Sequence, residues 1–349
     1  MFRQPRLTRT LRTIAERGPA AYYRGEIAQE LARSVRAVGG LLSTDDLAAH
    51  SSNWVEPLST RYRDVTVYEL PPNSQGIIAL LMLNVLQQLP AAPLQEGSAE
   101  YIHLLAEVAR LAYADREAHL TDPEHMSLDP ADLLTEEYAR RRAALVREHA
   151  GRVVAAGTSS DTIYLCAADE EGNLVSLIES NFMGIGSGIM AGETGIMLQN
   201  RGAWFSLDPG HPNAIAPHKR TMHTLMPGMA FKGERPWLVF GTMGGSAQAQ
   251  IHVQLLTRLI DQKMRLDDAL DAPRIDAVPV RDARQEQALL MEDRFSPQVT
   301  EELRRRGHDV RLLAPYTSEM GHAHAIELLD NGAYVGASDP RTTSLALGY

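Results

Sequence analysis

The chain has 349 residues, a formal net charge of -10 at pH 7, and a hydrophobic content of 44% beside a charged content of 22%. This length suffices for a large core in one or two domains, and the composition is that of a globular protein. The negative charge argues against a nucleic acid or an anionic membrane surface as partner. The single cysteine excludes an internal disulfide, so nothing points to an oxidising compartment.

No apolar run approaches the roughly 20 residues of a membrane span. The first residues lead directly into an amphipathic helix, without the apolar region of a signal peptide. Taken literally, this start predicts a cytoplasmic protein, which assumes that no further residues precede Met1.

The first half of the chain predicts mostly helices. Apolar residues recur there at helical spacing, serines stand at cap positions, and one stretch is so apolar that its helix should be buried. Helices are expected over 7–14, 27–38, 76–89, 98–120 and 131–148, with a short capped helix after Ser43 and one strand over 65–68.

The second half changes character after a segment rich in glycine, alanine, serine and threonine, 151–161, which reads as a linker. Short β-like runs then alternate with Gly, Asn and Asp turns, and helices lie between them. Strands are expected over 162–168, 174–178, 237–240, 325–329 and 333–336, and helices over 247–261, from Asp267, and over 297–306.

Thr162 is the candidate nucleophile, because it opens a strand directly after that linker. A threonine hydroxyl is a weak nucleophile, and one economical base is the residue's own α-amine, which exists only if the chain is cut just before it. With a pKa near ~8, such an amine suits general base catalysis at neutral pH. The pattern therefore predicts a precursor that cleaves itself between Asp161 and Thr162. A merely structural threonine at the start of a strand is the alternative.

Gly244 and Gly245 stand between a predicted strand and a predicted helix. Two backbone N–H groups at a helix N-terminus, unobstructed by side chains, could form an oxyanion hole, and a plain tight turn is the alternative. His223-Thr224 is either a polar pair near substrate or a turn. The histidines lack metal-ligand spacing, so no zinc site is expected, and no cofactor is implied.

A series of short motifs follows Thr162 along the chain. They are the Asp169–Asn173 loop, Gly184–Ile189, Gly192–Ile196, Leu198–Asn200, Asp208–Asn213, Lys219-Arg220, Gly244-Gly245, Ala272–Arg274 and Gly336–Arg341. This series resembles the γ-glutamyltranspeptidase (glutathione hydrolase) family over essentially the whole chain. The resemblance implies the α+β class and an N-terminal-nucleophile hydrolase fold, an αββα sandwich made jointly by two subunits that arise from self-cleavage.

The two subunits would be 1–161, the mostly helical remainder of the large subunit, and 162–349, the small catalytic subunit. Together they would form an αβ heterodimer. Family precursors carry a further stretch before the point where this chain starts, with part of the central sheet and an arginine for the α-carboxylate of the substrate. The resemblance therefore implies a sandwich that lacks the family's first segment.

The resemblance also implies roles for single residues. Thr162 takes the nucleophile position, and Ser180 stands where the family has a threonine that bonds the nucleophile and helps processing. Gly244 and Gly245 match the oxyanion glycines. In the same way, the two neighbouring residues His223-Thr224 occupy the place of a serine pair that holds the glutamyl α-carboxylate.

Three substrate-binding positions depart from the family pattern. Phe182, Arg201 and Trp204 stand where typical transpeptidases use Asn, Gln or Glu, and Asp to grip the γ-glutamyl unit. Trp204 cannot make the charge pair that an aspartate makes with an ammonium group. In these departures the chain resembles the branch of transpeptidase-like amidases and cephalosporin acylases. The identity of the acyl group in the substrate therefore stays open.

The main expectation is a self-processing N-terminal threonine hydrolase and aminoacyltransferase. It would act on a small γ-glutamyl or related amide, with water or an amine as acceptor. One alternative is an acylase for another amide, such as a dicarboxylic monoamide or a β-lactam side chain. The other alternative is an inactive, truncated remnant of such an enzyme.

Overall fold

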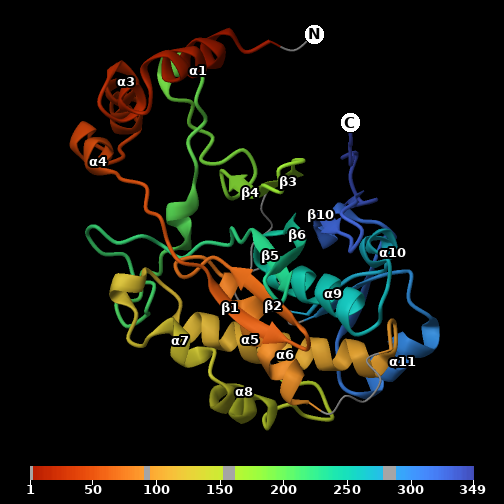
Figure 1. The fold of residues 1–349 in the computed structure, drawn as a ribbon. Helices are drawn as coiled ribbons and strands as arrows, with labels where there is room; N and C mark the ends of the chain where they lie inside the picture. Colours follow the sequence, from red (N-terminus) through yellow and green to blue (C-terminus); the bar gives the residue numbers. More distant parts are fainter. Residues whose placement is uncertain (1–2, 90–94, 152–161, 278–287) are drawn as a thin grey trace. The chain divides into compact units, whose positions relative to one another are not determined.

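The computed structural model describes residues 3–89, 95–151, 162–277 and 288–349. The chain divides into two compact units, a smaller one of Met1–Val55 and Asn181–Arg201 and a larger one of Glu56–Ser180 and Gly202–Tyr349 (Figure 1). The predicted fragments 1–161 and 162–349 do not coincide with these units, because each unit takes residues from both. The fragments concern processing and stay a prediction.

The smaller unit is helical, as its sequence predicts. Its α3 and the turn η2 pack around the buried residues Ile27, Leu31 and Ala191. Ser43 caps the fourth helix in a reciprocal capping box with Asp46. The elements are α1 Pro5–Arg17, α2 Ala20–Tyr23, α3 Glu26–Ala37, α4 Thr44–Ala49 and η2 Gly192–Thr194.

The larger unit is built around a six-stranded antiparallel sheet. Its strands, in spatial order, are β1 Leu58–Tyr62, β2 Val65–Glu69, β5 Gly228–Lys232, β6 Arg235–Met243, β10 His322–Leu328 and β11 Tyr334–Ser338. The predicted strands at β2, β6, β10 and β11 are confirmed, whereas β1 and β5 were not predicted. β1 pairs with β2 at the edge of the sheet, and β5 lies between β2 and β6.

Three long helices, α5 Gly76–Gln88, α6 Ala99–His119 and α9 Gln248–Ile260, form the layer beside this sheet (Figure 1). The apolar α5 is buried over its first eleven residues, 76–86, as predicted. Ser98 caps α6 by accepting a hydrogen bond from the Tyr101 N–H, also as predicted. This layer and the sheet share one hydrophobic core.

A hairpin of β3 Thr162–Ala168 and β4 Leu174–Ser180 covers the other face of the sheet. Phe240 of β6 contacts His252 of α9, with ring centroids 4.8 Å apart. The next residue, Gly241, faces Tyr164 of β3, because a Cβ there would lie 2.2 Å from that ring. Successive side chains of a strand point to opposite faces, so the larger unit has a helix layer, a sheet layer and a hairpin layer, in that order.

The outward face of the hairpin is apolar. Its exposed side chains are Ile163, Leu165, Val175 and Leu177, with exposed fractions of 61%, 46%, 48% and 48%. They alternate with the inward-facing residues along both strands, and Leu165 lies directly across the ladder from Leu177. An exposed aliphatic patch of this kind is typical of a surface that another polypeptide layer covers.

The predicted helix over 131–148 is wrong as a single element. It forms α7 Pro130–Leu133 and α8 Glu136–Ala143. The Thr135 hydroxyl accepts a hydrogen bond from the Tyr138 N–H and thereby starts a new helix. A side chain that satisfies an orphan N–H competes with continuation of the preceding helix, which explains the break.

The remaining elements are short helices and a second, smaller sheet. A small sheet of three unpredicted strands has β8 and β9 parallel, with α11 between them in sequence. The expected helices at α10 and α11 are confirmed. The elements are η1 Pro123–His125, η3 Arg201–Trp204, η4 Gly245–Ala247, α10 Leu266–Asp271, β7 Ile275–Asp276, β8 Leu289–Glu292, α11 Pro297–Arg305, β9 Val310–Leu313 and η5 Ser318–Met320.

Glu69 and His252 form a fully buried acid–imidazole pair, with Oε1 and Nδ1 2.7 Å apart. Burial raises the pKa of Glu69 well above its ordinary 4.5 and lowers the pKa of His252 from 6.5 to about 3. In the folded chain the pair is therefore a neutral acid beside a neutral imidazole. Between pH 4.5 and 6.5 the unfolded pair is a carboxylate and an imidazolium, so both states hold one proton.

We expect this pair to contribute no pH dependence to the stability of the chain between pH 4.5 and 6.5. Above that window the unfolded pair holds no proton and the folded pair still holds one. Raising the pH then costs roughly 1 kcal/mol per pH unit. Glu69→Gln should abolish this loss, which urea midpoints at about pH 6 and pH 8 measure. An equal fall for both proteins contradicts the assignment.

Candidate active site

Thr162 is the first residue of β3 and lies directly across the ladder from Ser180, the last residue of β4. The two residues thus form the open end of the hairpin. Both point to the same face as Tyr164, because alternate residues of a strand share a face. The structure therefore brings together the two hydroxyls that the sequence assigned to the nucleophile and its neighbour.

The open end of the hairpin lies toward the C-terminal end of β6. Farther from that end, the Ser176 hydroxyl donates to the carbonyl of Phe240 at 3.3 Å, and the Tyr164 ring covers Gly241. At the closed end, the Tyr334 hydroxyl donates to the carbonyl of Asp169 at 3.0 Å. From the closed end to the open end, the hairpin thus passes Phe240 and then Gly241. The Thr162–Ser180 pair lies beyond Tyr164 and so lies toward the residues that follow Met243.

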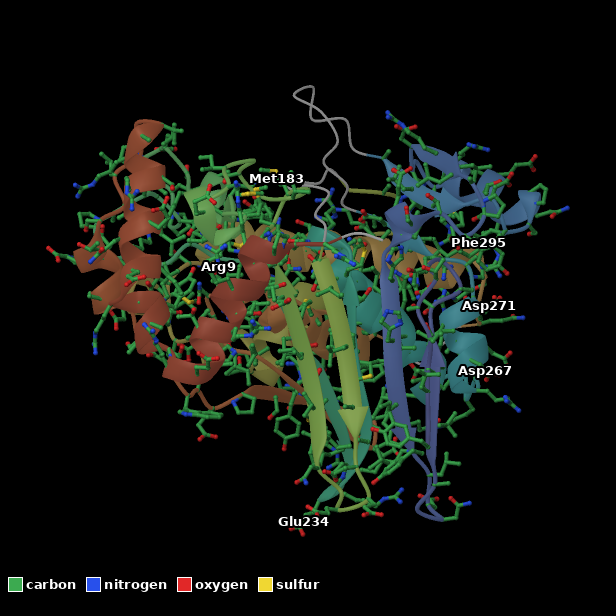
Figure 2. The ribbon with its side chains drawn as sticks, turned by 90° about the horizontal axis from the view of Figure 1, so that it is seen from above. Arg9, Met183, Glu234, Asp267, Asp271 and Phe295 are labelled. Atoms are coloured by element: carbon green, nitrogen blue, oxygen red, sulfur yellow. The ribbon has the colours of Figure 1, made fainter. Side chains whose placement is uncertain are left out.

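The strands of the β3–β4 hairpin run lengthwise alongside β10 and β11, which Figure 2 shows from above. Glu234, in the turn between β5 and β6, marks the end of the unit where the β3–β4 turn lies (Figure 2). The Gly244 turn follows the opposite end of β6. The Thr162–Ser180 end of the β3–β4 hairpin therefore lies at the Gly244 end of β6, and the β3–β4 turn lies at the other end.

Gly244 and Gly245 form the turn between β6 and α9, by way of η4. Gly244 has φ 144° and Gly245 has φ 57°, conformations that favour glycine. The Thr242 hydroxyl donates to the Met243 carbonyl at 2.6 Å, and the Ala247 N–H donates to the Gly244 carbonyl at 3.0 Å. Because N–H and C=O of one trans peptide point in opposite directions, these two bonds fix the N–H groups of Gly244 and Gly245.

His223 and Thr224 lie beside this turn. The Gln75 side-chain amide donates to the carbonyl of Gly245 at 3.0 Å and to that of Thr224 at 3.4 Å. The His223 Nδ1 accepts a hydrogen bond from the Leu225 N–H at 3.2 Å, so the proton of the neutral ring is on Nε2. The structure therefore joins the predicted polar pair to the predicted oxyanion turn.

Trp204 reaches the same cluster through Arg116. The guanidinium carbon lies 5.6 Å from the centroid of the Trp204 ring, and Arg116 Nη1 donates to the Ser246 hydroxyl at 3.1 Å. The contact is a cation–π interaction, which an aspartate at position 204 would replace by an ion pair. The aromatic residue therefore changes the charge of this side of the site.

Phe182 and Arg201 belong to the smaller unit. Phe182 is buried with φ 81°, and the Arg201 guanidinium lies 5.1 Å from the centroid of its ring. Burial lowers the pKa of the Arg201 guanidinium below its ordinary value. These two predicted substrate residues are therefore neighbours, and they form a cation–π contact.

Cys166, on the same face of β3 as Thr162, is a poor competitor for the nucleophile. Burial raises the pKa of its thiol from 9.0 to about 11. The reactive form of cysteine is the thiolate, which at neutral pH is scarce at such a pKa. Asp161, on the other side of the predicted cleavage point, lies outside the described residues.

Two further searches cover only the residues that the structure describes. Within them, no three His, Cys, Asp or Glu side chains gather in an arrangement that could hold a metal ion. Within the same ranges, no helix has the length and apolar character needed to cross a membrane.

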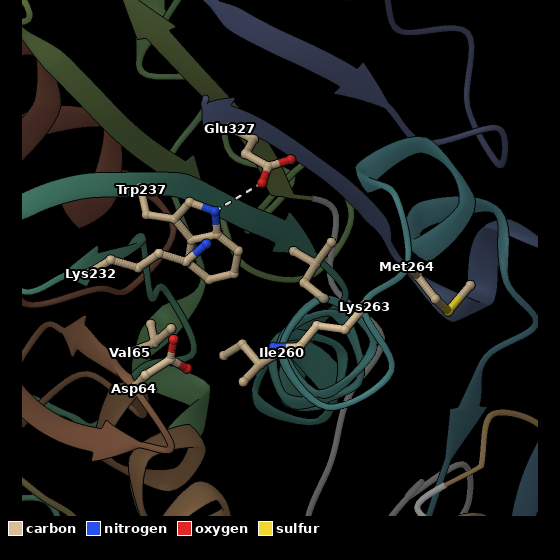
Figure 3. Close-up of a pocket in the computed structure, with 9 residues that line it drawn as sticks. Asp64, Val65, Lys232, Trp237, Ile260, Lys263, Met264 and Glu327 are labelled. Carbon is tan, nitrogen blue, oxygen red and sulfur yellow. Dashed lines mark hydrogen bonds between the residues drawn. The ribbon is translucent and has the colours of Figure 1, made fainter. Parts of the chain in front are cut away.

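A pocket of about 220 Å³ lies near the start of β6 (Figure 3), and its lining includes none of the predicted site residues that the structure describes. Its wall is the Trp237 ring, whose Nε1 donates to Glu327 at 2.9 Å and whose face holds the Lys232 ammonium at 4.1 Å. Asp64 and Lys263 also line it. The opposite charges balance one another, so the pocket favours no single class of ligand.

Sequence reasoning missed the residues that hold the turn from behind. They are Gln75, which directly precedes α5, and Tyr113 and Arg116 of α6, all more than a hundred positions before Gly244. No local pattern signals them, because Arg116 stands between Asp115 and Glu117 in a helix that carries several other charged residues.

Comparison with known proteins matches residues 1–349 to the family described as Gamma-glutamyltranspeptidase. The glutathione hydrolase-like YwrD proenzyme of Bacillus subtilis is 39% identical over 348 residues, which are 99% of this chain and 66% of that protein. The oxamate amidohydrolase proenzyme of Klebsiella pneumoniae is 37% identical over 349 residues, 100% of this chain and 66% of that protein. The chain thus spans about two thirds of the length of these relatives.

The fold is shared with a solved acylase. The crystal structure of cephalosporin acylase from Bacillus halodurans matches with a TM-score of 0.89 and 37% identity, over 98% of this chain and 62% of that chain. The similarity supports a fold of mixed helix and sheet, common to this acylase and the chain. Since the family match covers every residue, and similar proteins include a glutathione hydrolase-like protein, an amidohydrolase and an acylase, the chain belongs to the γ-glutamyltranspeptidase family, on its amidase and acylase side.

Proposed function

We propose that the chain is a self-processing N-terminal threonine amidohydrolase. The observation that carries the proposal is the position of Thr162 at the open end of β3, across from Ser180 and toward the Gly244 turn. Of the described hydroxyls on this hairpin, only Thr162 combines the first position of the strand with a predicted cleavage point before it. The family membership supports the same chemistry.

Self-processing would begin when the Thr162 hydroxyl attacks the carbonyl of Asp161. The peptide bond breaks, an ester forms to Oγ, and the Thr162 nitrogen leaves as a free amine. Water then hydrolyses the ester, which gives a carboxylate at Asp161 and a free hydroxyl at Thr162. The products, 1–161 and 162–349, would stay together as an αβ heterodimer.

In turnover, the Thr162 amine would take the proton of Oγ while Oγ attacks the amide carbonyl. The N–H groups of Gly244 and Gly245 would stabilise the oxyanion, and the amine would pass its proton to the leaving nitrogen. The acyl group then remains on Thr162 as an ester. Water would release it as an acid, and an amine acceptor would release it as a new amide.

We propose further that the two subunits complete an αββα sandwich. The described residues supply one helix layer, the main sheet and the β3–β4 layer. The apolar outer face of β3–β4 is where the second helix layer would pack, because it presents four exposed aliphatic side chains.

The residue types at the three family positions that grip the γ-glutamyl unit favour an acyl group without an α-ammonium group. The positions of Phe182, Arg201 and Trp204 carry two aromatic rings and a cation, and none supplies a carboxylate for an ammonium. Relatives named as an oxamate amidohydrolase and an acylase support this choice. The candidate that retains the ammonium, a γ-glutamyl amide, is favoured instead by the glutathione hydrolase-like relative.

Two anilides that differ only in the α-ammonium group separate these candidates. We expect glutaryl p-nitroanilide to be cleaved with a kcat/KM at least about tenfold above that of γ-glutamyl p-nitroanilide, since an unpaired buried ammonium is penalised. The release of nitroaniline by purified protein measures both. A reversed ratio favours the γ-glutamyl candidate. Cleavage of neither anilide contradicts both substrate assignments and favours an inactive remnant.

A further inference from the structure

Three buried side chains, Gln75, Tyr113 and Arg116, stand behind the glycine turn, and we call them the bracket. All three are almost fully buried in the larger unit. Gln75 precedes α5, and the other two lie one turn apart on α6. The bracket touches the turn at the carbonyl groups of Gly245 and Ser246 and at the Ser246 hydroxyl.

The bracket closes the hydrogen bonding of the turn. The Gln75 amide donates to the Gly245 carbonyl at 3.0 Å, and the Tyr113 hydroxyl donates to the Ser246 carbonyl. With the bonds to Met243 and Gly244 described above, four consecutive carbonyls each accept a hydrogen bond. Every peptide plane from 243 to 246 is thereby held against rotation.

Arg116 holds the bracket itself. Its Nη1 donates to Gln75 Oε1 and to the Ser246 hydroxyl, both at 3.1 Å. Because Gln75 Oε1 accepts from Arg116, its Nε2 must face the Gly245 carbonyl. The guanidinium lies 4.6 Å from the Tyr113 ring centroid and is also held by Glu117 at 2.8 Å. A buried guanidinium with these contacts is fixed in one orientation.

We propose that Tyr113 and Arg116 are positioning residues for the oxyanion turn, acting through the Ser246 carbonyl and through Gln75. The inference rests on the proposed function, because it deepens the role of the same glycines. Donors to a developing oxyanion lower the barrier only when they are oriented before the reaction. The bracket supplies that orientation from helices that never contact the reacting atoms.

The chain offers matched controls for both residues. Tyr101, on the same helix as Tyr113, is equally buried and its hydroxyl bonds Thr257 Oγ1 at 2.7 Å, far from the turn. Arg258 is a second buried arginine, bonded to Glu96 at 3.0 Å and to backbone carbonyls. Each control loses the same group in the same kind of surroundings.

The first test compares Tyr113→Phe with Tyr101→Phe, and Arg116→Lys with Arg258→Lys, on the anilide that the wild type cleaves. We expect the bracket variants to lose about tenfold in kcat with KM changed less than about twofold, while the controls keep both constants. Similar melting temperatures within each pair would exclude a difference in folding. A kcat that falls equally in variant and control overturns the inference.

The second test needs no substrate and so separates this inference from the proposed function. Hydrogen–deuterium exchange of a peptide covering 242–250 should be about fivefold faster in Tyr113→Phe than in wild type, and unchanged in Tyr101→Phe. Equal exchange in both variants overturns the inference, even if the wild type is active. An inactive wild type with faster exchange in Tyr113→Phe contradicts the proposed function and leaves the positioning of the turn supported.

Discussion

Thr162→Ala is expected to leave the chain as one polypeptide of 38.4 kDa, while the wild type separates into 1–161 and 162–349. The variant lacks the hydroxyl that we propose attacks the Asp161 carbonyl and later carries the acyl group. Hydrolysis of the anilides should fall to background in the same preparation. This is the largest effect we expect from any single substitution in the chain.

Intact mass under denaturing conditions, taken on fresh protein and after storage, measures the result. Ser176→Ala is the matched control, because it also deletes a hydroxyl from the β3–β4 hairpin, one that bonds Tyr164 at 2.8 Å. It should cleave like the wild type. Cleavage of Thr162→Ala at the same bond would place the nucleophile elsewhere. A wild type that stays whole would contradict self-processing in this chain.

Gly244→Ala is expected to reduce kcat by about 10²- to 10³-fold, the loss typical of a missing oxyanion donor. The φ of 144° at this position is one that alanine rarely adopts, and an added Cβ would lie 3.0 Å from Ile251 Cδ1. The backbone must therefore rotate, and the N–H of residue 244 turns away from the oxyanion. KM should change little, because the lost contact forms in the transition state.

Gly332→Ala is the control for backbone strain. Gly332 has φ 84° in the β10–β11 turn, and no atom lies within 4 Å of an added Cβ. Both substitutions should cost on the order of 1 kcal/mol of stability, measured by urea unfolding. Only Gly244→Ala should lose activity. If both variants lose activity in proportion to their stability, the glycine turn has a structural role and not a catalytic one.

Local signals of the sequence predicted most helices and the β3–β4 hairpin correctly. The apolar run of α5, the Ser98 cap of α6 and the alternation of β3 and β4 act within a few residues, so they can be read directly. The strands β1 and β5 escaped notice, although each pairs with the next strand along the chain, because neither short segment has a run of β-branched or aromatic residues. The single helix over 131–148 failed at Thr135, where a cap interrupts the helical pattern.

The candidate site divides in the same way. Thr162 and Gly244 were found because a nucleophile at a strand start and paired glycines before a helix have recognisable local patterns. Tyr113 and Arg116 were not found, because nothing near them in sequence shows that they meet the glycine turn. The departures at Phe182, Arg201 and Trp204 were visible only against the family pattern.

The sequence by itself determined most of the helices, part of the main sheet, the family and the candidate nucleophile, because residue type and short spacing encode these. Only the tertiary structure decided that Thr162 faces Ser180, that the hairpin covers β6, and that Gln75 joins Thr224 to Gly245. These contacts join residues up to about 170 positions apart in the chain. Chain folding sets such proximities through the packing of whole layers, for which no local pattern exists.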